Sequence, residues 1–322
     1  MPPGHPRGNI AHRAALSNGL PISWASQQNL CYELPEMRTA IFLLLLILPL
    51  AAELKLPLET SFVGKERFES IRQKASTEEW HRLPIGDRVA RIALQFEGTS
   101  YKSYTLEIHD RIESPSANLM GMDCWTFFEI SLAWARLLED NHRNYGPSDL
   151  LRAIEVTRYR GGQCHGHYLD RLHYLADWYI DNDKRRTIDD LTRKFPYRRM
   201  PPQCGEMTRL WKYYRYLREN PELRAGMAEH EKRLNATPVY MIPKAKVAAI
   251  EPKLANGDII GIARNDKGSY CSHVGLIIID KEGRRRFMHA STDARKVIVD
   301  QAISQYLARF KKHAGILVAR PN

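Results

Sequence analysis

The feature of this sequence that most constrains its fold is a change of pattern near Pro238. Upstream, apolar residues recur at helical spacing, as in the segment from Ile85 to Phe96. Downstream, short β-rich runs are separated by turn residues: VYMIP, NGDIIGIAR, CSHVGLIIID, RRRFMHAS and ARKVIVD. Helices followed by an antiparallel meander are typical of the α+β class. We therefore predict N-terminal helices packed on a C-terminal antiparallel β-sheet or half-barrel.

The same periodicity predicts the positions of the individual helices. They are expected over about 65–74, 85–96, 123–138, 147–157, 168–180 and 301–310, with a last strand over 315–319. Residues 181–235 are polar, basic and helical in part. Because no flexible linker separates the two halves, residues 53–322 are predicted to form one domain, with a helical insertion around 147–235.

The N-terminal region is expected to be a targeting segment. Residues 37–52, MRTAIFLLLLILPLAA, have one basic residue, an apolar run and then small residues, which is the layout of a secretory signal peptide. The run is too short for a comfortable membrane span. We expect cleavage near Ala51 or Ala52, with Met37 as the true start and residues 1–36 as a non-native or disordered leader. A buried apolar helix behind such a leader is the alternative.

Net charge and cysteine content limit which partners and which disulfides the chain can have. The formal net charge of +11 favours acidic partners. No zinc-finger spacing, ribonucleoprotein motif or long basic run occurs, so we expect no nucleic-acid partner. Export would leave Cys124, Cys164, Cys204 and Cys271, which allow two disulfides, or one disulfide and two free thiols. A Cys164–Cys204 disulfide is one candidate.

Cys124 is the candidate nucleophile, because it follows a good N-cap residue, Asp123, at the head of an apolar helix. Backbone amides and the macrodipole at a helix N-terminus favour a thiolate. Such a thiol needs a histidine base and a group that orients it. His273 and His289 lie on strands that the turn at 281–283 makes an antiparallel pair, so their imidazoles are expected to meet. An inert packed cysteine and ordinary strand histidines are the alternatives.

These segments together resemble the NlpC-type, papain-like cysteine peptidase superfamily that cleaves peptidoglycan. The motifs that carry the resemblance are EGTSY, MDCWTFFE, SHVGLII and FMHAS, in that order. YRGG, RLHYLADWYIDN and LANGDIIGI make the chain most similar to the N-acetylmuramoyl-L-alanine amidase-like branch. The similarity covers roughly residues 85–318. Ser100 and Trp125 depart from the family pattern, and Trp125 stands beside the thiol.

The resemblance implies a role for each matching residue. Cys124 would attack the amide carbonyl, His273 would be the general base, and His289 would orient His273. Tyr101, with the backbone N–H of Cys124, would stabilise the oxyanion. The substrate-binding residues implied by the branch are Arg171, His173 and Tyr174. A helix packing face with a surface arginine accounts equally well for these last three.

The resemblance also implies a reaction, a substrate and a compartment. The reaction would be hydrolysis of the N-acetylmuramoyl–L-alanine bond in muropeptides, with or without a 1,6-anhydro sugar, in the periplasm or cell envelope. The alternatives are an endopeptidase that cuts the stem at γ-D-Glu and a non-catalytic cell-wall-binding module. A related lipid transferase is disfavoured, because some such relatives carry the histidine ahead of the cysteine.

A metal site is a further alternative, because QCHGHY groups Cys164, His165 and His167, with His173 shortly after. The spacing is not a standard zinc arrangement. A polar, glycine-containing loop accounts for the same residues. We therefore expect no metal and no cofactor.

Overall fold

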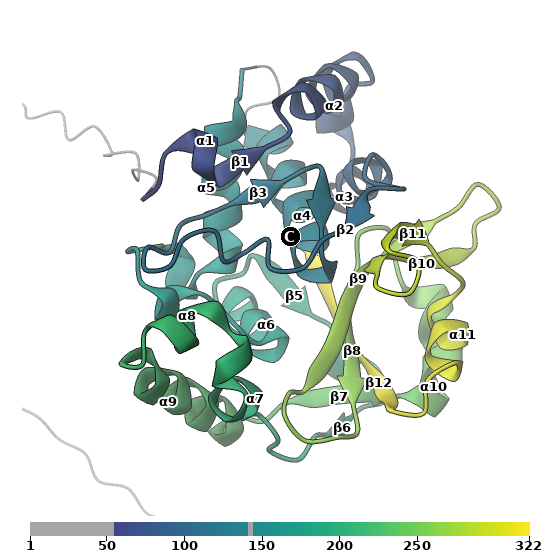
Figure 1. Cartoon of the computed structure of the whole chain (residues 1–322). Coiled ribbons are helices and arrows are strands. Elements are labelled where there is room, and N and C mark those ends of the chain that lie inside the picture. The colour runs from purple at the N-terminus through teal and green to yellow at the C-terminus, as the bar shows by residue number, and fades with distance from the viewer. Residues whose placement is uncertain (1–54, 141–143) are drawn as a thin grey trace, which may run out of the picture. The chain divides into compact units, whose positions relative to one another are not determined.

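The computed structural model describes residues 55–140 and 144–322, and these are built around a large mixed β-sheet (Figure 1). The signal peptide expected at 37–52 and the start at Met37 lie outside the described residues. The strands of the sheet are β2 (Ser100–Tyr101), β4 (Gly121–Met122), β5 (Ile188–Asp190), β6 (Arg198–Arg199), β7 (Tyr240–Pro243), β8 (Ile259–Arg264), β9 (Cys271–Ile279), β10 (Arg285–Ser291), β11 (Lys296–Val299) and β12 (His313–Pro321). Their order is β4-β2-β11-β10-β9-β8-β12-β7-β6, and β5 pairs with β12.

Four consecutive strands, β8 to β11, form the predicted antiparallel meander. The C-terminal strands pair antiparallel, as predicted, but the whole sheet is mixed, because β2 and β4 from the N-terminal half join its edge and pair in parallel. Each of these two strands has two residues, too few to show a period of two in the sequence. A separate parallel pair joins β1 (Phe62–Val63) to β3 (Ala117–Asn118).

The helices largely follow the predicted pattern, and the α+β class is confirmed. They are α1 (Leu58–Ser61), α2 (Lys65–Thr77), α3 (Ile85–Leu94), α4 (Cys124–Asp140), α5 (Pro147–Arg158), α6 (Leu175–Lys184), α7 (Glu206–Arg209), α8 (Arg215–Glu219), α9 (Leu223–Ala236), α10 (Lys244–Ile250) and α11 (Ile303–Ala308). Helix α10 was not predicted. No helix among the described residues combines the length and apolar content needed to cross a lipid bilayer.

The helix predicted over 168–180 was wrong in its first half. Residues 168–170 form one 3-10 turn, and α6 begins only at Leu175. Arg171 is extended and bridges to Tyr159, while the Leu172 amide donates to the Arg158 carbonyl. The segment after the turn therefore pairs with the end of α5, which prevents a continuous helix.

Alternate side chains of the meander enter two separate hydrophobic cores. Val274 and Leu276 of β9 belong to the larger core, which includes the buried face of α4. Ile277 of β9 and Phe287 of β10 belong to the smaller core, with residues of α10 and α11. This division follows from the alternation of side chains along a strand. The same alternation places His273 of β9 and His289 of β10 on the sheet face of the smaller core.

Candidate active site

Helix α4 begins at Cys124, as predicted, because Asp123 caps it. The Asp123 carboxylate accepts a hydrogen bond from the Thr126 amide at 2.8 Å, and the Thr126 hydroxyl accepts one from the Asp123 amide at 3.0 Å. This reciprocal pairing satisfies amides that a helix start would otherwise leave free. The following turns are almost wholly buried, which holds the helix and its first residue in place.

The Cys124 thiol does not have the low pKa that its place at a helix start predicts. Burial, followed by the charge of Asp123, raises the pKa of Cys124 to about 12. The backbone amides of Val274, Cys124 and Trp125 oppose the rise but do not outweigh burial. The thiol is therefore protonated at neutral pH, and a nearby base is required to activate it.

The two predicted histidines are in direct contact. His273 Nε2 lies 2.7 Å from His289 Nδ1, and the rings are perpendicular, with centroids 4.7 Å apart. Both rings contact Phe287 and Tyr306, so they share the sheet face that α11 covers. Burial, then the neighbouring His289, lowers the pKa of His273 well below its ordinary value. His273 is therefore neutral at neutral pH and able to accept a proton.

Asp300 extends this pair, and the sequence reasoning missed it. Its carboxylate lies 3.4 Å from His289 Nε2 and also accepts a hydrogen bond from Arg309 at 2.5 Å. Burial would raise the pKa of Asp300, but the Gln301 amide, Arg309 and His289 outweigh it, so the pKa is below its ordinary value. A signal was available, because Ile298 pairs with His289 and side chains two residues apart share a face.

Tyr101 lies beside Cys124 because two short strands bring them together. Strand β2 pairs with β4 so that Tyr101 is opposite Met122, two residues before the thiol. The Tyr101 amide also donates to the Arg295 carbonyl at 2.8 Å. Burial, then the charges of Cys124 and Asp123, raises the pKa of Tyr101 to about 12. The phenol is therefore protonated and available as a hydrogen-bond donor.

Two cavities meet at these residues, and both are lined by Cys124, Ser272 and His273. The larger, of about 440 Å³, extends toward α6 and α7. All three predicted substrate-binding residues, Arg171, His173 and Tyr174, line it. The smaller, of about 380 Å³, extends toward α11 and is lined by Tyr101, His289 and Asp300, among others. A substrate that places its scissile bond at Cys124 therefore has space on both sides.

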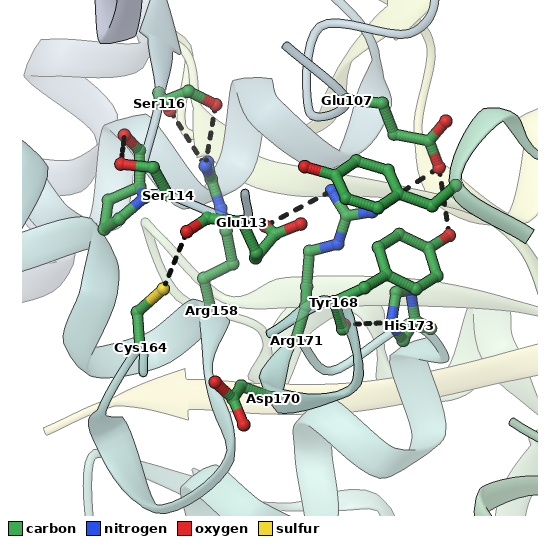
Figure 2. A network of polar contacts seen from close by, with 12 residues as sticks. Glu107, Glu113, Ser114, Ser116, Arg158, Cys164, Tyr168, Asp170, Arg171 and His173 are labelled. Atoms are coloured by element: carbon green, nitrogen blue, oxygen red, sulfur yellow. Dashed lines mark hydrogen bonds and ion pairs between the residues drawn. The ribbon is translucent and has the colours of Figure 1, made fainter. Parts of the chain in front are cut away.

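Arg171 is not the surface arginine of the alternative interpretation, since it is 3 % exposed. Figure 2 shows it in a network of buried charges with Glu107 and Glu113. Its guanidinium nitrogens lie 3.5 and 3.7 Å from those carboxylates, and its carbon lies 4.9 Å from the Tyr168 ring centre. Burial would lower the pKa of Arg171, but Glu113 and Glu107 outweigh it and hold the pKa above its ordinary value.

His173 and Tyr174 use their polar atoms mainly for internal contacts. His173 Nε2 lies 2.8 Å from the Tyr168 carbonyl oxygen, and burial lowers its pKa well below the ordinary value (Figure 2). The Tyr174 hydroxyl donates to Glu231 at 2.6 Å and accepts from the Met207 amide at 2.9 Å. The ring surfaces of His173 and Tyr174 are therefore more available to a ligand in the larger cavity than their polar atoms are.

The alternatives for the remaining cysteines are not supported. Cys124, Cys164, Cys204 and Cys271 are all free thiols, so the Cys164–Cys204 disulfide considered above is not formed. The Cys164 thiol donates to the Glu113 carbonyl at 3.5 Å. Within the described ranges, no group of three or more His, Cys, Asp or Glu side chains is placed to hold a metal ion.

The fold and the family are both found in known proteins. A family model described as AmiA-like, N-acetylmuramoyl-L-alanine amidase-like, matches residues 91–316. A solved N-acetylmuramoyl-L-alanine amidase from Bacteroides uniformis ATCC 8492 is 29 % identical, with a TM-score of 0.66, over 74 % of this chain and 99 % of that chain. A Bacteroides fragilis structure described as a xylanase candidate is 34 % identical, with a TM-score of 0.63, over 71 % and 98 %.

A Legionella pneumophila protein of the DUF1460 family model is 21 % identical, with a TM-score of 0.56, over 79 % of this chain and 93 % of that chain, and it shares the fold alone. No curated protein sequence matches the chain. The family match covers more than half of the chain and includes the stretches that carry Cys124, His273 and His289. The chain therefore belongs to the AmiA-like family, which is N-acetylmuramoyl-L-alanine amidase-like.

Proposed function

We propose that this protein is a cysteine amidase that hydrolyses the bond between N-acetylmuramic acid and L-alanine in muropeptides. The observation that carries the proposal is the position of Cys124 at the head of α4, on two cavities that it shares with His273. His273 in turn contacts His289. A nucleophile, a base and an orienting group are the parts that covalent amide hydrolysis requires. The arrangement agrees with the papain-like, NlpC-type chemistry expected from the sequence.

The contacts of the two imidazoles support one assignment of their protons. His273 uses Nε2 toward His289, so only Nδ1 is left to take the thiol proton. That nitrogen has a free lone pair when His273 carries its proton on Nε2 and donates it to His289 Nδ1. His289 then carries its own proton on Nε2, which faces the Asp300 carboxylate at 3.4 Å. Asp300 and His289 would thus hold His273 in the tautomer that can act as base.

The proposed reaction has two steps, acylation of Cys124 and hydrolysis of the resulting thioester. The Cys124 sulfur attacks the lactyl carbonyl carbon while its proton moves to His273 Nδ1, and Tyr101 and the Cys124 amide donate to the oxyanion. The C–N bond then breaks, and His273 returns the proton to the leaving L-alanine amine. In the second step, water attacks the thioester and gives a proton to His273. The carboxylic acid is released, and the sulfur recovers its proton.

The electrostatics of the site favour proton transfer coupled to attack over a preformed ion pair. The pKa of Cys124 is raised and that of His273 is lowered, so both groups rest in their neutral forms. A neutral pair also costs less to bury than a thiolate facing an imidazolium. The acidic limb of the pH profile should consequently lie below pH 6.5, the ordinary pKa of histidine.

Amide hydrolysis is supported over glycoside hydrolysis, the activity suggested by the description of the Bacteroides fragilis relative. Glycosidases work with a pair of carboxyl groups at the scissile bond. Asp293 and Asp300 also line the smaller cavity, but Asp300 is paired with His289 and Arg309, and the groups in the nucleophile, base and orienting positions at Cys124 are a thiol and two imidazoles.

We also propose export to the cell envelope, where peptidoglycan is found, from the layout of residues 37–52.

Mass spectrometry of digested muropeptides tests the proposal. The expected products are a free N-acetylmuramoyl sugar and a stem peptide that begins with L-alanine, from substrates with and without the 1,6-anhydro sugar. A sugar that keeps an L-Ala-D-Glu dipeptide would identify an endopeptidase instead. Cys124→Ala should abolish turnover and leave the circular dichroism spectrum unchanged. Turnover by that variant would refute the cysteine mechanism, and no turnover of any muropeptide by the wild type would favour the binding module.

A further inference from the structure

A basic hollow lies next to the active site and has no role in the proposed chemistry. It measures about 390 Å³ and is lined by Arg264, Ser272, Arg309, Phe310, Lys311, Lys312 and His313. Ser272, Arg309, Phe310 and His313 also line the smaller catalytic cavity. The two spaces therefore adjoin, and Ser272, which lines both, precedes His273 in the sequence.

The charges of this hollow are only partly neutralised. None of the described residues that line it is acidic. Arg264 pairs with Glu206 and Asp266 at its edges, and Lys312 lies 3.4 Å from the same Asp266. Arg309 is paired with Asp300. No ion pair is formed by Lys311 within the described part of the chain, and the Lys312 side chain is 78 % exposed. An anion entering the hollow therefore meets an excess of positive charge.

The loop that carries these lysines is held in place by hydrogen bonds to its own backbone carbonyl groups. Lys244 donates from its ammonium group to the Phe310 carbonyl at 3.0 Å, and the Asn265 amide donates to the Lys312 carbonyl at 3.1 Å. Phe310 also packs against His313, with ring centres 4.6 Å apart. The lysines are thus presented from a structured loop, which lowers the entropy cost of binding a ligand there.

The two sides of Cys124 differ in chemistry, and this gives the substrate a direction. The larger cavity is lined by several aromatic rings together with Glu107, Glu206 and Arg171, a set suited to a sugar with an apolar face and many hydroxyl groups. Arg264 also lines it, at the edge that it shares with the hollow. The smaller cavity shares more of its wall with the cationic hollow, namely Ser272, Arg309, Phe310 and His313. A muropeptide has a neutral, hydroxylated sugar at one end and a stem with free carboxylates at the other.

We propose that the hollow lined by Lys311, Lys312 and Arg264 is a binding subsite for the carboxylates of the acidic stem peptide. This rests on the proposed function, because it places the sugar in the cavity beside Arg171 and the leaving peptide beyond His273. Its ligand class is an acidic peptide. The lysine ammonium groups contribute attraction that depends on salt, since both side chains are solvated.

The test compares two substrates that differ only in charge. One is N-acetylmuramoyl-L-Ala-D-Glu with free glutamyl carboxylates, and the other has both carboxylates amidated. Lys311→Ala/Lys312→Ala should raise KM for the acidic substrate about three- to tenfold and leave KM for the amidated one unchanged, with kcat preserved. Lys281→Ala, an exposed lysine in the β9–β10 turn, is the matched control and should change neither.

Salt gives a second measurement. Raising the salt from about 0.05 M to about 0.5 M should remove most of the difference between the two substrates in the wild type. Equal KM values for the two substrates, or an equal effect of Lys281→Ala, would overturn the subsite. So would tight binding of an oligonucleotide without any preference for the acidic stem, which would identify a general polyanion surface.

Binding without turnover separates this proposal from the proposed function. The inactive Cys124→Ala variant is titrated with the free L-Ala-D-Glu dipeptide and its diamide by calorimetry. Weaker binding of the acid form after Lys311→Ala/Lys312→Ala supports the subsite, even if the wild type cuts no muramoyl amide. Cleavage of the amidated substrate with no discrimination in this titration would support the amidase and reject the subsite.

Discussion

At the scale of single residues, the candidate site is a chain of groups that leads from a thiol to a guanidinium. Cys124 lines both cavities. His273 and His289 are in contact at 2.7 Å, and Asp300 connects the second imidazole to Arg309. Each group orients the one before it, and only the first two would touch the substrate. Asp300 is therefore a positioning residue in the proposed mechanism.

Asp300→Asn tests this role. The amide keeps the shape of the carboxylate but removes the charge that favours a proton on His289 Nε2. We expect kcat to fall about 10- to 100-fold with little change in KM, and the acidic limb of the pH profile to move. Asp280→Asn, which changes an acid in the β9–β10 turn, should leave the kinetics unchanged. A fall in thermal stability with normal kcat per folded molecule would mean that Asp300 is only structural.

The candidate site could be predicted in part because its key groups have strong local signals. Cys124 follows an N-cap residue, and the two histidines lie on strands joined by a short turn. The raised pKa of Cys124 could not be predicted, because burial depends on packing contributed by distant parts of the chain. Arg171 was expected to line the cavity, but its burial between two carboxylates has no local signature in the sequence.

At the scale of elements, a buried ion pair ties α4 to α5 behind the cavity. Arg158 Nε donates to Glu129 at 2.7 Å, and the two side chains are 1 % and 0 % exposed. Arg158 also donates to the Ser116 carbonyl at 2.9 Å, which fixes the loop ahead of Cys124 (Figure 2). Removing one member of such a pair leaves an unpaired buried charge, which costs far more than a surface ion pair contributes.

Arg158→Met should therefore lower the free energy of unfolding by about 3–5 kcal/mol. Arg152→Met is the matched control, because it lies on the same helix in a half-exposed pair with Asp149 and should cost at most about 1 kcal/mol. Denaturant unfolding followed by circular dichroism measures both. Similar losses in the two variants would contradict the argument. Adding Glu129→Met to the first variant should recover part of the loss, since no unpaired charge remains.

The elements predicted well from the sequence are those whose own residues show a full strand or helix pattern of apolar side chains. Strands β8 to β11 have turn residues at every junction, and α3 to α5 show helical spacing over ten or more residues. The errors fall where tertiary pairing overrides the local pattern. Arg171 and Leu172 pair with the end of α5 instead of entering a helix, and β2 and β4 exist only because the meander offers an edge.

At the scale of the whole molecule, several buried and partly buried histidines make stability depend on pH. Burial lowers the pKa of His173, His273 and His289, and it lowers the pKa of His230 and His313 to about 4. In the unfolded chain these rings titrate near pH 6.5. Below that pH the unfolded state binds more protons than the folded state, so acid destabilises the fold through these groups. Burial raises the pKa of Glu113 and Glu129, and such carboxyls have the opposite effect.

Because the two effects oppose each other, a difference between variants isolates one histidine. His173 is partly buried, its pKa is lowered well below the ordinary value, its ring is bonded to the Tyr168 carbonyl, and asparagine cannot titrate in its place. The slope of unfolding free energy against pH between about 4.5 and 6 should therefore be smaller in His173→Asn by up to about 1.4 kcal/mol per pH unit. His165→Asn, which replaces an exposed ring in the preceding loop, is the control for the substitution itself. Identical slopes in the wild type and His173→Asn would show that His173 is protonated in the folded protein, against the burial argument.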